Sequence, residues 1–118
     1  AMIKKIRESI KTDFGLGCHL HNTRNTGFAN AAAAAVAGID FLDASIGGIG
    51  GCPFAPRATG NIATEDLCFM LRNMGYQTGV NIEKLITTAE WTEQFFEAPL
   101  PGQVMKAGLF PEASKTVA

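Results

Sequence analysis

Two histidines stand two positions apart, and His19 and His21 are the only histidines of the chain. Side chains at alternate positions of a strand point to the same side of the sheet. If this segment is a strand, both imidazoles face one side, where two neutral rings could share one metal ion. An isolated pair with this spacing is also compatible with two surface histidines, or with one buried ring and one exposed ring.

A glycine-rich segment occupies positions 47–53 and reads Gly-Gly-Ile-Gly-Gly-Cys-Pro. Glycines permit backbone angles that other residues avoid and allow close approach to a ligand, and a loop of this kind can close as a lid. Gly50 and Gly51 would provide this freedom, and Cys52 could then reach a site as an acid, a base or a nucleophile. The alternative is a flexible turn that happens to contain a cysteine.

Three further polar residues could belong to the same site. Asn61 follows Cys52 by nine positions, and an amide oxygen is a suitable ligand for a hard cation, although asparagine is also common before a helix. Asp43 lies on the polar face of a second predicted strand, either near the site or as a satisfied carboxylate without a chemical role. Arg24 could contact an anionic substrate, and a solvated loop explains it equally well.

The elements that would position these residues alternate between helix and strand. Apolar periodicity, caps and breakers predict helices over 2–12, 28–37, 64–73 and 82–96, and strands over 16–21 and 39–46. Such alternation predicts an α/β fold with two parallel strands and flanking helices. Because two strands do not form a stable sheet alone and a (β/α)₈ barrel needs roughly 250 residues, we expect a piece of a larger barrel, or a chain that needs a partner.

Composition narrows the class of protein. The 118 residues are 47% hydrophobic and 18% charged, with a net charge of −1 and no basic stripe, which disfavours binding to nucleic acid or to a membrane surface. No apolar run approaches the roughly 18–20 residues of a membrane span. Three cysteines without a Cys-x-x-Cys pair argue against a disulfide framework and a structural zinc site. A globular protein of the cytoplasm is the resulting prediction.

Taken in order, these pieces resemble the 3-hydroxy-3-methylglutaryl-CoA (HMG-CoA) lyases, from about Gly17 to Leu85. The matching segments are His-Leu-His-Asn-Thr at 19–23, Asp-Ala-Ser-Ile-Gly-Gly-Ile-Gly-Gly-Cys-Pro-Phe-Ala at 43–55, and Ala-Thr-Gly-Asn-Ile-Ala-Thr-Glu-Asp-Leu at 58–67. The Gly-Gly-Cys-Pro segment is typical of this lyase group, whereas the histidine pair is shared with isopropylmalate and homocitrate synthases.

The resemblance implies the C-terminal portion of a (β/α)₈ TIM barrel, incomplete alone, over residues 1–98, followed by a tail over 99–118. It implies that His19, His21 and Asn61 bind Mg²⁺ or Mn²⁺, and that Cys52 takes part in proton transfer when its loop closes. The acyl-CoA substrate would be cleaved to acetyl-CoA and acetoacetate, as in leucine degradation and ketone body metabolism. A homo-oligomer is implied for the full-length protein.

The chain departs from the family pattern in ways that keep alternatives open. It lacks the family's first-strand Arg-Asp pair, so we expect the chain to be inactive alone. Asn22, Arg24 and Asn25 differ from the Asp-Thr-Tyr-Gly pattern of some members. A citramalyl-CoA-type lyase, a Claisen-type synthase and a non-catalytic metal- or thiol-binding module therefore remain as alternatives.

Overall fold

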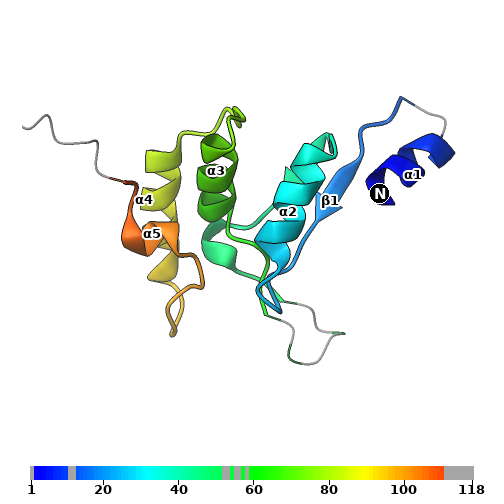
Figure 1. The fold of residues 1–118 in the computed structure, drawn as a ribbon. Helices are drawn as coiled ribbons and strands as arrows, with labels where there is room; N and C mark the ends of the chain where they lie inside the picture. Colours follow the sequence, from blue (N-terminus) through cyan, green and yellow to red (C-terminus); the bar gives the residue numbers. More distant parts are fainter. Residues whose placement is uncertain (1, 11–12, 52–53, 55–56, 58, 111–118) are drawn as a thin grey trace, which may run out of the picture.

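The computed structural model of the chain describes residues 2–10, 13–51, 54, 57 and 59–110. Its two strands are parallel neighbours, which confirms the α/β prediction. Figure 1 shows α3, α4 and α5 grouped together, with α2 and β1 beside them and α1 beyond β1. The elements are α1 (Met2–Ile10), β1 (Gly17–His19), α2 (Gly27–Val36), β2 (Phe41–Asp43), the 3₁₀ turn η1 (Ile46–Gly48), α3 (Thr64–Asn73), α4 (Ile82–Glu93) and α5 (Val104–Ala107).

Both strands are shorter than the predicted spans 16–21 and 39–46. After β1, His21 forms an antiparallel bridge with Asn61, and after β2, Ser45 forms a parallel bridge with Ala63. Ile62 lies between these bridges, where its N–H donates to Leu20 O and its carbonyl accepts from Ser45 N, both at 3.2 Å. Residues 61–63, just before α3, thus bond to the backbone of residues that were predicted to extend the two strands.

The two-stranded sheet packs on helices through one face. Its first hydrophobic cluster is built on Ala31 from α2, Leu67 from α3 and the fully buried Ile62. Leu20 and Leu42 pack against this cluster, whereas His19, Phe41 and Asp43, which alternate with them, are exposed. In α2 only Gly27, Ala31 and Ala34 are buried, so this alanine-rich helix buries one stripe of its surface.

A second hydrophobic cluster joins α4 to a C-terminal helix that the sequence reading did not predict. Ala89 of α4 packs there with Leu100 and Met105, and Ile46 and Ile49 of the glycine-rich segment pack against them. Leu100 and Met105 both fall within residues 99–118, the range predicted to be a tail. Helix α5 has only four residues, which is too short to show an apolar periodicity in the sequence. Such a short helix is stabilised by its tertiary contacts.

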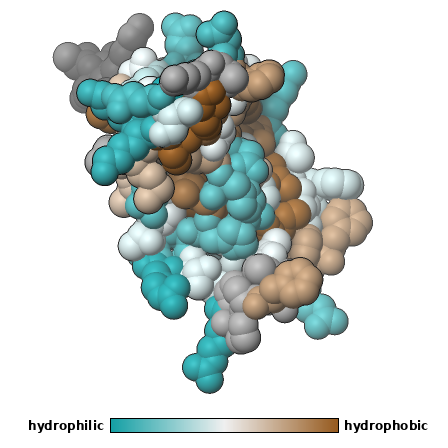
Figure 2. Space-filling model, turned by 90° about the vertical axis from the view of Figure 1, so that its right-hand side faces the viewer, coloured by the Kyte–Doolittle hydropathy of each residue, from teal (hydrophilic) through white to brown (hydrophobic). Residues whose placement is uncertain are grey.

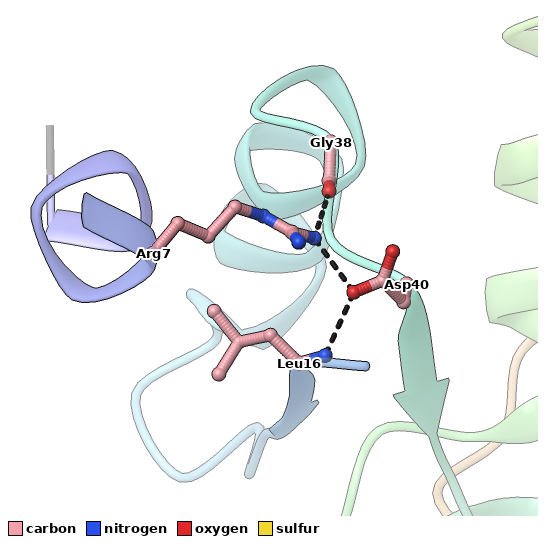
Figure 3. A network of polar contacts seen from close by, with 4 residues as sticks. All are labelled: Arg7, Leu16, Gly38 and Asp40. Carbon is pink, nitrogen blue, oxygen red and sulfur yellow. Dashed lines mark hydrogen bonds and ion pairs between the residues drawn. The ribbon is translucent and has the colours of Figure 1, made fainter. Parts of the chain in front are cut away.

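The opposite ends of the strands, where β1 and β2 begin, are tied to α1 by a polar network (Figure 3). Arg7 donates to Gly38 O at 2.6 Å and to Asp40 Oδ2 at 2.7 Å. The same carboxylate oxygen accepts from Leu16 N at 2.7 Å. That backbone hydrogen bond and the Arg7 guanidinium hold the pKa of the Asp40 carboxyl below its ordinary value.

Many large apolar side chains remain exposed. Viewed from the side of α1, hydrophobic surface appears among hydrophilic groups (Figure 2). The exposed large apolar side chains include those of Phe14, Val36, Phe41, Trp91 and Phe95. The aromatic pair Trp91 and Phe95 therefore lies outside the core of the described chain. In the described part of the chain, no helix combines the length and the apolarity that crossing a bilayer requires.

Candidate metal centre and glycine loop

His19 and Asp43 end the two strands in register. The parallel ladder places the two residues directly opposite each other, on the face of the sheet that does not pack on α2. His19 Nδ1 lies 2.7 Å from Asp43 Oδ2. A carboxylate can only accept in this pair, so Nδ1 carries the hydrogen, which in the neutral ring leaves the lone pair on Nε2. This is the arrangement by which a carboxylate orients a metal-binding imidazole.

His21 is oriented in the same sense by a backbone carbonyl. Its Nδ1 lies 3.0 Å from Thr59 O, and because a carbonyl only accepts, Nε2 of this ring is also free to bind a metal. The two imidazole rings have centroids 5.1 Å apart and an interplanar angle of 75°. Alternation along the chain therefore brings the two rings together, with an acceptor-type nitrogen available on each.

Asn61 lies beside His21 through the antiparallel bridge. Its Nδ2 donates to Ile49 O at 3.1 Å, which fixes which way the amide faces. Its Oδ1 is buried and has no hydrogen-bond partner among the described residues. An unpaired buried acceptor is costly, and a cation is one of the few groups that would satisfy it.

These donor atoms fit a divalent cation. Two imidazole nitrogens and one amide oxygen are ordinary ligands of Mn²⁺, and an oxygen ligand is also suited to Mg²⁺. Within the described ranges, no three His, Cys, Asp or Glu side chains gather closely enough to hold a metal ion. A cation held by the two histidines of this part of the chain would therefore need an amide, such as that of Asn61, as a third ligand.

The glycine-rich segment covers the amide of Asn61. Gly50 has φ 112°, a conformation that favours glycine, and a Cβ at this position would lie 2.8 Å from Asn61 Nδ2. Gly60 packs even more closely on the loop, because its Cβ would lie 2.0 Å from Gly48 O. Gly51 is exposed. Cys52 lies outside the described residues, so its expected role in proton transfer stays a prediction.

Of the two remaining predicted site residues, Asp43 contacts a histidine and Arg24 does not. Asp43 was expected either near the site or as a satisfied carboxylate without a chemical role, and it lies against His19, one of the two candidate ligands. Arg24 is exposed in the turn before α2, and no hydrogen bond among the described residues involves its side chain. Its contact with an anionic substrate stays a prediction.

Glu65 is a residue of the loop region that the sequence reading missed. It lies in the first turn of α3, and its side chain is completely buried. Its Oε2 accepts from Gly47 N at 3.0 Å. Burial raises the pKa of this carboxyl above its ordinary value. One feature of the sequence could have predicted its burial: Glu65 stands three residues before Cys68, on the same face of the helix, and Cys68 is buried.

The chain is similar in sequence to known lyases. The chain is 52% identical over 101 residues to the (R)-citramalyl-CoA lyase of Chloroflexus aurantiacus, covering 85% of this chain and 32% of that protein. It is 41% identical over 106 residues to the hydroxymethylglutaryl-CoA lyase YngG of Bacillus subtilis, covering 87% of this chain and 36% of that protein.

Solved structures give the same result. The fold superposes with a TM-score of 0.76 on an HMG-CoA lyase from Acinetobacter baumannii in complex with coenzyme A and 3-methylmalate. That match has 42% sequence identity and covers 82% of this chain and 33% of the other. The chain thus spans about a third of the length of the relatives it matches. Since residues 1–91 match the family described as HMGL-like, the chain belongs to that family.

Proposed function

We propose that this chain contributes the two histidines and the asparagine of a divalent-metal site in an acyl-CoA lyase. The observation that carries the proposal is the state of the donor atoms: both imidazoles are held through Nδ1, and Asn61 Oδ1 is buried without a partner. A Mg²⁺ or Mn²⁺ ion held by His19, His21 and Asn61 would polarise oxygen atoms of the substrate.

The proposed reaction is cleavage of HMG-CoA to acetyl-CoA and acetoacetate. The C3 hydroxyl loses its proton and becomes a carbonyl, the C2–C3 bond breaks, and its electron pair forms the enolate of acetyl-CoA. That enolate then takes a proton at C2. Asp43 would orient His19, Gly50 and Gly51 would allow the loop to move, and Cys52 would carry a proton to or from the reacting atoms. Arg24 is the candidate contact for the negative charge of the substrate.

The complete protein would be needed for this activity. We place the chain as the C-terminal part of a (β/α)₈ barrel, because parallel strands with the donor atoms at their carboxyl ends match the usual location of barrel active sites. Further ligands would come from other strands, and the chain alone is expected to be inactive. Homo-oligomer formation and a cytoplasmic location are proposed for the complete protein on the family resemblance and the cysteine content.

A second candidate substrate is citramalyl-CoA. The chain is 52% identical to a lyase named for (R)-citramalyl-CoA and 41% identical to one named for hydroxymethylglutaryl-CoA. The two thioesters carry the same tertiary hydroxyl and differ by one methylene before the carboxylate. A site that binds tightly around one of them discriminates by about 10–200-fold, because one methylene is worth only about 1–3 kcal/mol.

A hybrid enzyme tests the proposal. In this hybrid, the present chain replaces the homologous third of the Bacillus subtilis lyase YngG, and the unmodified lyase is the control. We expect the hybrid to release acetyl-CoA in a Mn²⁺-dependent reaction, and the ratio of kcat/KM for the two thioesters identifies the preferred one. A hybrid that folds and binds Mn²⁺ yet cleaves neither thioester would refute the lyase proposal.

A further inference from the structure

The buried carboxylate of Glu65 meets the first glycine of the loop from one side. Among the described residues, Glu65 is the one charged side chain that is buried, and it is 0% exposed. Its Oε2 accepts from Gly47 N at 3.0 Å, whereas its Oε1 has no hydrogen-bond partner. A buried carboxylate with an unpaired oxygen contributes little to stability, so the position of Glu65 suggests a role other than stabilising the fold.

Gly102 meets the same glycine from the other side. Its N–H donates to Gly47 O at 3.0 Å, so both polar backbone groups of Gly47 are held. The fit is close, because a Cβ on Gly102 would lie 2.3 Å from Glu65 Oε1 and 3.3 Å from Gly47 Cα. Gly47 itself has φ 60°, and a Cβ there would lie 2.4 Å from Leu100 Cδ1. Gly47, the first residue of the glycine-rich segment and here called the loop root, is therefore held between α3 and the segment that precedes α5.

The neighbouring acid holds that segment in place. Asp66 Oδ1 accepts from Val104 N at 2.6 Å, and its Oδ2 accepts from Gln103 N at 2.9 Å. Leu100 and Met105 of the same segment pack with Ile46 and Ile49 of the loop in the second hydrophobic cluster. Polar and apolar contacts thus join the loop root and residues 100–105 into one unit.

The loop root in turn sets the orientation of Asn61. Two residues after Gly47, the carbonyl of Ile49 accepts from Ser45 Oγ at 2.6 Å and from Asn61 Nδ2 at 3.1 Å. Because the amide nitrogen is bound there, Oδ1 must face the other way, where it is buried and unpaired. A shift of Gly47 would displace the Ile49 carbonyl and release the amide.

We propose that Glu65 is a positioning residue that, by holding Gly47 against Gly102, fixes the Ile49 carbonyl and so directs Asn61 Oδ1 toward the metal. The carboxylate acts through the loop and contacts neither substrate nor metal. The inference rests on the proposed metal site. It implies that this site also needs residues 100–105, because they hold Gly47 in place.

The test measures Mn²⁺ affinity of the hybrid enzyme and its variants, with Mn²⁺ alone as the probe. Glu65→Leu removes the acceptor for Gly47 N, and we expect the Kd for Mn²⁺ to rise by about tenfold, as for loss of other residues that orient ligands. Glu65→Gln keeps an acceptor oxygen and should restore most of the affinity. The matched control is Leu67→Ala, a buried neighbour on α3 that belongs to the first cluster and should destabilise the fold without changing the Kd.

A second variant serves if Glu65→Leu does not fold. Gly102→Ala places a methyl group against the Glu65 carboxylate and should also weaken Mn²⁺ binding, although it lies far along the chain from the histidines. Gly75→Ala is its control, since a Cβ at Gly75 meets nothing within 4 Å, even though its φ of 88° makes an alanine there strained. Amide hydrogen exchange over residues 46–50 should accelerate in Glu65→Leu and Gly102→Ala alone.

The possible failures are separable. If the unmodified hybrid binds no Mn²⁺, the proposed metal site is wrong and the role of Glu65 falls with it. If the hybrid binds Mn²⁺ and Glu65→Leu or Gly102→Ala binds it equally well, the positioning role is refuted while the metal site stands.

Discussion

Asp43 lies directly opposite His19 across the two parallel strands, with its Oδ2 2.7 Å from His19 Nδ1. This pairing gives the carboxylate a defined use, because it selects the tautomer of His19 that leaves Nε2 free for a metal. It also means that the two strands must be in the observed register for the imidazole to be held.

Replacing Asp43 with alanine should weaken Mn²⁺ binding by about 10–100-fold, because the His19 ring loses the partner that orients it. Titration with Mn²⁺ followed by electron paramagnetic resonance measures the change. Asp40→Asn is the matched control, since Asp40 sits at the other end of β2 and bonds to Arg7 and Leu16 instead. Equal affinities for Asp43→Ala and the unmodified hybrid would show that the hydrogen bond between His19 and Asp43 has no role at the metal.

Mn²⁺ should stabilise the fold through Asn61. At a free concentration of 100 times its Kd, a ligand bound by the native state alone adds about 2.7 kcal/mol to the free energy of unfolding. Asn61→Ala should remove most of the resulting rise in Tm, which thermal unfolding with and without Mn²⁺ records. Asn73→Ala, at an exposed site on α3 whose side chain bonds to Phe69 O, should leave the rise intact. The same Mn²⁺-induced rise in both variants would contradict the assignment of Asn61 as a ligand.

Gly60 should tolerate no side chain. Its Cβ would lie 2.0 Å from Gly48 O and 3.0 Å from Gly50 O, so Gly60→Ala must displace the backbone of the loop. A displacement of about 1 Å near the reacting groups can cost about 100-fold in rate, and we expect a loss of kcat/KM of this order. Gly38→Ala provides the comparison, because Gly38 has φ 79° but open space around its Cβ. Comparable activity in the two variants would mean that the close approach is unimportant.

The buried Glu65 should make stability fall as pH rises. Burial, and secondarily the charge of Asp66, raise the pKa of this carboxyl above 4.5, its ordinary value, against opposing hydrogen bonds from the Gly47 and Glu65 amides. The folded chain therefore keeps the proton to a higher pH than the unfolded chain does. Its contribution to stability is complete below the ordinary pKa and is lost as pH rises through the raised one.

Glu65→Gln removes this titration, so its free energy of unfolding should vary less with pH above 4.5 than that of the unmodified hybrid. Urea unfolding at a series of pH values measures the difference. Glu83→Gln, at an exposed position in the first turn of α4, should retain the full dependence. An unchanged slope in Glu65→Gln would show that another group is responsible.

The sequence by itself determined the local pattern. Alternation predicted that His19 and His21 share a face opposite Leu20, and the structure confirms this arrangement, because side-chain direction along a strand depends only on the backbone. Helical periodicity likewise located α2, α3 and α4 to within a few residues. The order of motifs also predicted the family, which the comparisons confirm.

Only the tertiary structure decided which distant groups meet. The pairing of His19 with Asp43 depends on the register of the two strands. The hydrogen bond between His21 and Thr59 O depends on the path of the loop between the second strand and α3. The burial of Glu65 depends on the close approach of Gly102. Helix α5 is stabilised by contacts with α3 and α4 rather than by its own four residues. Contacts of this kind join residues far apart in the chain, and no local spacing in the sequence encodes them.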